Sequence, residues 1–121
     1  MASEKAIDSE QIIELEALVN KLEREPAAGC FLEPVDHEGL GLTDYLLVVK
    51  KPMDLRTCKT LLRKGKYGSY GELFSDIELI WSNCKAYNTE GSDIYDLACQ
   101  MEAAAKRAIS QFNSKMLLSG N

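Results

Sequence analysis

The stretch NCKAYNTEGSDIYDLA, residues 83–98, joins two apolar patterns with helical spacing and places Asn88 at the join. Asparagine is unfavourable inside a helix and prefers caps and turns. The simplest interpretation is that Asn88 ends one helix before the next begins near Ser92 or Asp93. The alternative is that the Asn88 side chain is held at this position to bind a ligand.

Outward from this join, apolar residues recur at helical spacing in four segments, and no segment has the alternation of a strand. The segments run over about 9–24, 54–64, 69–87 and 92–112. Asp8 with Gln11, and Ser69 with Glu72, each fit a capping box, and Asp54 is a favourable N-cap residue. The sequence therefore predicts an all-α chain, most simply a four-helix bundle.

A long connection separates the first two predicted helices. Residues 25–53 contain three prolines and three glycines together with many apolar side chains, which is too apolar for a disordered linker. A long connection of this kind in a compact domain is usually a functional loop. We expect a short helical turn at residues 44–49, one domain over residues 9–115, and flexible ends at residues 1–8 and 116–121.

The composition limits the classes of function. With 121 residues, a net charge of -5 and a pI near 4.9, the chain is poorly suited to a nucleic-acid backbone and better suited to basic partners such as Lys-rich tails. No apolar run approaches the ~20 residues that cross a bilayer, and the N-terminus does not fit a signal peptide. We therefore expect no membrane span, and contact with nucleic acid at most in a secondary role.

Metal binding and catalysis find little support in the sequence. The four cysteines, Cys30, Cys58, Cys84 and Cys99, form no CxxC pair, which indicates a reducing, intracellular compartment. The single histidine, His37, lies between Asp36 and Glu38, where a solvated turn is the simplest interpretation. Gly-rich phosphate-binding loops are absent from the sequence. We expect no metal, no cofactor and no enzymatic activity.

Polar aromatic and amide groups gather in two of the predicted connections. In an up-down bundle the first and third connections emerge at the same end, so Tyr45 would lie across from Tyr87, Asn88 and Tyr95. Ligand clefts often form between such loops. The alternative, that the tyrosines only pack the loops and Asn88 only caps a helix, stays open on these residues alone.

Four motifs carry a resemblance to a known family. They are FLEPVD at residues 31–36, DY at 44–45, KPMDL at 51–55 and NCKAYN at 83–88. In order and spacing, from the first helix to about Phe112, the chain resembles a bromodomain. The resemblance implies a left-handed four-helix bundle whose long ZA loop and short BC loop form a pocket for acetyl-lysine.

The resemblance also implies a role for individual residues. Asn88 matches the asparagine whose amide donates to the acetyl carbonyl, and Tyr45 matches the tyrosine that reaches the same oxygen through a water. The remaining positions match the apolar wall (Val35, Leu40, Leu42), the pocket floor (Phe31), the aromatic residue before the asparagine (Tyr87) and the gatekeeper beside the mouth (Ile94).

Some positions depart from the commonest pattern of the family. Gly29 and Cys30 stand before Phe31 where Trp-Pro is frequent, Thr43 replaces a common proline, and Leu46 replaces a second aromatic residue after Tyr45. These changes affect the surroundings of the pocket and leave both anchor residues in place. They bear on which peptide sequence is preferred.

The expected partners follow from the resemblance. They are peptides with acetylated lysine, above all the tails of histones H3 and H4, and small molecules that mimic acetyl-lysine. The isolated domain is expected to be a nuclear monomer. The competing hypothesis is a helical protein–protein interaction module, or a bromodomain-like scaffold that does not bind acetyl-lysine.

Overall fold

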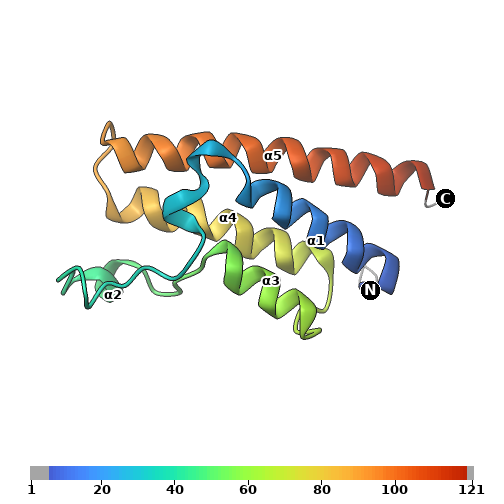
Figure 1. Ribbon diagram of the computed structural model, residues 1–121, viewed down its shortest axis with the longest axis horizontal. Coiled ribbons are helices and arrows are strands. Elements are labelled where there is room, and N and C mark those ends of the chain that lie inside the picture. Colours follow the sequence, from blue (N-terminus) through green and yellow to red (C-terminus); the bar gives the residue numbers. More distant parts are fainter. Residues whose placement is uncertain (1–5, 120–121) are drawn as a thin grey trace.

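The computed structural model describes residues 6–119 and is an all-α bundle (Figure 1). Four longer helices form its body, and a 3₁₀ helix and a one-turn helix interrupt the long connection; no strand occurs in the described residues. In chain order the elements are α1 (Ser9–Glu23), η1 (Pro26–Phe31), α2 (Tyr45–Val48), α3 (Leu55–Arg63), α4 (Tyr70–Tyr87) and α5 (Asp93–Ser119). The predicted four-helix bundle and the short turn in the long connection are confirmed.

The two loops that the sequence placed together do lie at one end of the bundle. In Figure 1, α2 with its flanking segments and the α4–α5 loop are both at the left, and the ends of α1 and α5 near the two termini are at the right. The long connection returns to the bundle through Lys51. Its carbonyl accepts a hydrogen bond from Asn83 Nδ2 (2.8 Å), and its Nζ pairs with Asp76 Oδ1 (3.0 Å). Both partners belong to α4, so this helix fixes the end of the loop.

Local hydrogen bonds set the helix starts, with one exception to the prediction. Asp8 Oδ1 accepts from the Gln11 amide (2.8 Å) while Gln11 Oε1 accepts from the Asp8 amide (3.2 Å), as the capping box requires. The capping box at Ser69 is wrong, because the Ser69 side chain makes no capping hydrogen bond. Glu72 Oε1 instead accepts from the amide of Gly68 (2.8 Å), one residue further back. The missing side chain of Gly68 leaves room, since a Cβ there would lie 3.3 Å from Glu72 Oε2.

Asp54 is the N-cap of α3, and its side chain is only 3% exposed. Its carboxylate accepts from the Thr57 amide (2.8 Å) and from the Thr57 hydroxyl (2.6 Å). We expect Asp54→Ala to lower the free energy of unfolding by about 1–2 kcal/mol, because it leaves the amide of Thr57 unpaired. Urea denaturation checks this, with Asp54→Asn, which keeps an acceptor oxygen, as the control. Equal stability of Asp54→Ala and the wild type would contradict the assignment.

The core brings η1 onto the long helices. Phe31, at the end of η1, packs edge-on against Trp81 of α4, with ring centroids 5.4 Å apart. Trp81 and Met101 are both 0% exposed and lie in this core. This contact anchors the start of the long loop in the core, so the two ends of the loop are held by the same helix.

The last helix is longer than the sequence indicated. It continues to Ser119, so residues 116–119 of the expected flexible C-terminus are helical. Contacts with α1 account for the extra turns, because Lys115 Nζ pairs with Glu14 (3.3 Å) and Gln11 Nε2 lies 3.5 Å from Met116 Sδ. Residues 1–5 and 120–121 of the expected flexible ends lie outside the described residues. Within residues 6–119, no helix is both long and apolar enough to cross a bilayer.

Candidate functional site

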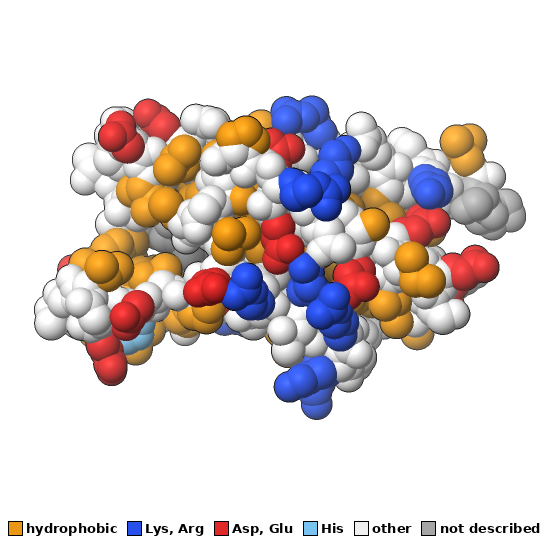
Figure 2. All heavy atoms as spheres, viewed as in Figure 1, with side chains coloured by type: hydrophobic (Ala, Val, Ile, Leu, Met, Phe, Trp, Pro, Cys, Tyr) orange, Lys and Arg blue, Asp and Glu red, His pale blue; other side chains and the backbone are white. Residues whose placement is uncertain are grey.

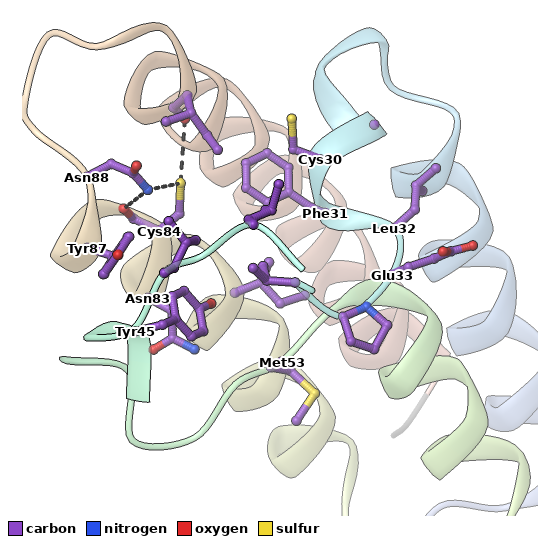
Figure 3. A pocket seen from close by; sticks show the side chains of 17 residues that line it. Cys30, Phe31, Leu32, Glu33, Tyr45, Met53, Asn83, Cys84, Tyr87 and Asn88 are labelled. Atoms are coloured by element: carbon purple, nitrogen blue, oxygen red, sulfur yellow. Dashed lines mark hydrogen bonds between the residues drawn. The ribbon is translucent and has the colours of Figure 1, made fainter. Parts of the chain in front are cut away.

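A cavity of about 610 Å³ opens between the long loop and the α4–α5 loop (Figure 3). The eight residues predicted from the sequence all line it. They are Phe31, Val35, Leu40, Leu42, Tyr45, Tyr87, Asn88 and Ile94. They come from η1, the long loop, α2, the end of α4 and the start of α5, so the fold brings together residues that are far apart in the sequence.

Asn88 ends α4 and also reaches the cavity. Its backbone is extended (φ -105, ψ 156), and its amide N–H donates to the Cys84 carbonyl (3.0 Å) as the helix cap. The side-chain Nδ2 donates to the same carbonyl (2.9 Å) and lies 3.6 Å from Cys84 Sγ, as Figure 3 shows. A thiol is a weak acceptor, so the second N–H of the Asn88 amide can donate to a stronger acceptor, such as a carbonyl oxygen, in the cavity. Asn88 therefore caps α4 and also places its side-chain amide at the cavity.

Two tyrosines form the wall next to Asn88. The rings of Tyr45 and Tyr87 meet edge-to-face with centroids 5.0 Å apart, and the Tyr87 hydroxyl donates to Asp44 Oδ1 (2.6 Å). Burial raises the pKa of Tyr45, whereas the hydrogen bond to Asp44 is the main cause that raises the pKa of Tyr87. Both phenols therefore keep their protons near neutral pH and can donate hydrogen bonds.

His37 is not the solvated turn residue that the sequence indicated. It is half-buried, and its ring stacks on Tyr45 with centroids 5.4 Å apart and planes 11° from parallel. A tight turn brings it there, since Asp36 Oδ1 accepts from the Gly39 amide (3.0 Å). This turn requires glycine, because a Cβ at Gly39 would lie 2.2 Å from Asp36 Oδ2. No local pattern in the sequence indicates that His37 and Tyr45 meet.

Several residues of the cavity were not predicted as site residues. Met53 and Cys84 are among them. Cys84 precedes Asn88 by four residues, which places both on one helix face and is a signal that could have found it. Tyr95, considered with the other tyrosines, does not line the cavity. The additional lining residues are Gly29, Cys30, Leu32, Glu33, Pro34, Met53, Ile80, Asn83 and Cys84.

Charge is unevenly distributed around the cavity. Residues 33–49 contain four acidic side chains, and residues 86–105 contain four more, with no lysine or arginine in either range. In Figure 2 the left end shows Asp and Glu side chains without Lys or Arg, whereas the middle and right of this face show side chains of both charges. Among the described residues, no group of three or more His, Cys, Asp or Glu is arranged to hold a metal ion.

Comparison with known proteins agrees with this geometry. The bromodomain family profile matches residues 15–100. The chain is 40% identical over 113 residues to transcription factor GTE2 of Arabidopsis thaliana. The aligned segment covers 93% of this chain and 18% of that protein. It is 36% identical over 85 residues to histone acetyltransferase GCN5 of Debaryomyces hansenii (70% of this chain, 18% of that protein). It is 30% identical over 115 residues to nucleosome-remodeling factor subunit NURF301 of Drosophila melanogaster (95% of this chain, 4% of that protein).

The chain spans less than a quarter of the length of each of these curated relatives. The match therefore concerns one domain of longer proteins. It includes all four motifs and both loops around the cavity. The chain belongs to the bromodomain family.

Proposed function

We propose that this domain is a non-catalytic reader that binds N-acetyl-lysine in proteins. Asn88 Nδ2 donates to the acetyl carbonyl, and the Tyr45 hydroxyl reaches the same oxygen through a water. The observation that carries the proposal is that one cavity holds the Asn88 amide and the Tyr45 hydroxyl between apolar walls. The Tyr45 hydroxyl makes no hydrogen bond to any other described residue, which leaves it available to a water.

The chemistry of the cavity discriminates between acetylated and free lysine. Acetylation removes the charge of the lysine and leaves a neutral amide with a methyl group. Apolar side chains such as Val35, Leu42 and Ile94 accept this group, whereas an ammonium ion would lose its hydration without a partner. The amide carbonyl then needs one donor, which Asn88 supplies.

The acidic loops support a basic peptide as the partner. Residues 33–49 and 86–105 contain Asp and Glu but no Lys or Arg, and segments of both ranges border the cavity. Their negative charge attracts chains rich in lysine and arginine and disfavours a phosphate backbone. We propose acetylated histone tails, in particular those of H3 and H4, as the natural ligands, and small-molecule mimics of acetyl-lysine as competitors. Two relatives are a histone acetyltransferase and a nucleosome-remodeling factor subunit, which supports a nuclear role. The isolated domain is proposed to act as a monomer.

One observation favours a second candidate function. Leu46, Leu47 and Val48 of α2 are 50%, 73% and 44% exposed, an apolar surface that a protein partner could cover. A pure interaction module would use this surface and would not require the Asn88 amide. The two functions are separated by whether binding depends on acetylation.

An array of acetylated and unmodified histone peptides tests the proposed function. We expect signals from acetylated peptides only, with the preferred sequence given by the strongest of them. Binding that is the same for both forms of the peptides, or no binding by a chain whose circular dichroism shows it to be folded, would contradict it. Such a result would favour the interaction module.

Tyr45→Phe is expected to weaken binding of an acetylated peptide by roughly two- to fivefold, because it removes a contact made through a water and keeps the packing of the ring. Calorimetric titration with the best peptide of the array measures the change. Tyr70→Phe, in an aromatic cluster with Phe74 and Phe112 outside the cavity, is the matched control. A loss as large as that of an Asn88 variant would assign a direct contact to Tyr45.

A further inference from the structure

The long loop forms a second hollow, of about 360 Å³, beside the main cavity. It is lined by His37, Glu38, Gly41, Leu42, Thr43 and Leu46. Leu42 lines both spaces, so the two adjoin at this residue. His37 also connects them, because its ring stacks on Tyr45 of the main cavity. A ligand held in the main cavity therefore has the second hollow as a direct neighbour.

The lining of the hollow combines apolar surface with one negative charge. Leu42 and Leu46 supply the apolar part, and His37 supplies a flat ring. Glu38 is exposed, and within residues 6–119 its carboxylate takes part in no hydrogen bond or ion pair. No lysine or arginine occurs between residues 33 and 49 to neutralise it. The negative charge of Glu38 is therefore not balanced by any residue between 33 and 49.

We propose that this hollow is a subsite for a cationic side chain, preferably arginine, next to the acetyl-lysine in the same bound peptide. This rests on the proposed function, since the acetyl-lysine in the main cavity brings the neighbouring residue to the hollow. The aliphatic stem of the side chain lies on Leu42 and Leu46, and the guanidinium pairs with Glu38. Arginine is favoured over lysine because its planar group can lie on the ring of His37 and bind a carboxylate through two donors.

Other occupants fit the same lining less well. A phosphate or nucleic-acid backbone would meet Glu38, with no lysine or arginine between residues 33 and 49 to attract it. A purely apolar side chain would pack on Leu46 but would leave Glu38 without a partner. The more exposed Leu47 and Val48 do not line the hollow, so the subsite is distinct from the general apolar surface of α2.

The test uses a set of short glycine–serine peptides, each with one acetyl-lysine and one arginine. Across the set, the arginine occupies in turn each of the three positions before and the three positions after the acetyl-lysine. Each peptide is paired with a version in which citrulline, of equal size but neutral, replaces the arginine. Affinities are measured for the wild type, Glu38→Gln and Glu90→Gln. Glu90 is the matched control, because it is an exposed acid in the α4–α5 loop that does not line the hollow.

For at least one arginine position, we expect the wild type and Glu90→Gln to bind the arginine peptide about two- to fivefold more tightly than the citrulline peptide. For Glu38→Gln we expect the two peptides to bind equally. A preference for arginine that survives in Glu38→Gln, or that Glu90→Gln loses to the same extent, would overturn the subsite. A preference that survives in Glu38→Gln would mean that the arginine binds somewhere other than at Glu38. An equal loss in Glu90→Gln would mean that the arginine responds only to the overall negative charge of the domain.

Failure of the proposed function would look different. In that case the wild type would bind the peptides no better than their unacetylated forms, whatever the residue beside the lysine. That result overturns the subsite together with acetyl-lysine recognition. Acetyl-dependent binding without any preference for arginine overturns the subsite alone.

Discussion

Asn88→Ala is expected to abolish measurable binding of acetylated peptides while the domain stays folded. The substitution removes the only proposed direct donor to the acetyl carbonyl, and an unpaired carbonyl in the cavity costs about 1–3 kcal/mol, or tenfold or more in affinity. Because a single domain with one anchoring residue binds weakly, such a loss takes the affinity below detection.

The fold should survive because the helix cap at this position is mainly a backbone contact. The Asn88 N–H donates to the Cys84 carbonyl (3.0 Å), and alanine keeps that hydrogen bond. The side-chain bond to the same carbonyl (2.9 Å) and the weak contact with Cys84 Sγ (3.6 Å) are lost. We therefore expect the free energy of unfolding to fall by no more than about 1–2 kcal/mol.

Titration calorimetry and thermal denaturation of the same samples measure both quantities. Asn88→Asp is an informative companion, because it has the same size but cannot donate when ionised. Asn113→Ala, at an exposed position of α5, is the matched control for loss of an asparagine. Retained binding by Asn88→Ala would refute the role of the amide, and unfolding of Asn88→Ala would show that the residue acts chiefly as a cap.

The second large effect concerns stability. Trp81→Ala is expected to lower the free energy of unfolding by about 3–5 kcal/mol, because it empties a large, fully buried site in α4. For a domain of this size the midpoint of thermal unfolding should fall by roughly 10–20 °C. The effect extends to the pocket floor, since Phe31 loses the ring against which its edge packs.

Trp81→Phe separates packing from polarity. The indole Nε1 is buried and has no hydrogen-bond partner among the described residues. Phenylalanine leaves a smaller cavity and removes this unpaired donor, so its cost should be well below that of alanine. Urea denaturation of both variants measures the difference, with Ile13→Ala, at a position 69% exposed on α1, as the control. A loss in Trp81→Ala no greater than in Ile13→Ala would contradict a core role.

Except at the Ser69 capping box, the sequence alone was sufficient where a structure depends on neighbours within a few residues. Apolar spacing predicted the four helices, and the capping box of Asp8 with Gln11 and the N-cap at Asp54 involve contacts three residues apart. The four motifs predicted the family, and eight of the seventeen residues that line the cavity were named from the sequence. Their use in binding acetyl-lysine stays a prediction.

Only the tertiary structure decided contacts between segments whose meeting no local pattern encodes. The stacking of His37 on Tyr45 depends on how the long loop turns, and the hollow beside Glu38 depends on where that loop places Leu42 and Leu46. The length of α5 depends on contacts with α1 about a hundred residues away in the chain. Local hydrogen bonds and helical periodicity depend on residues that are close in the sequence and can be predicted from it. These contacts instead depend on how the whole bundle packs.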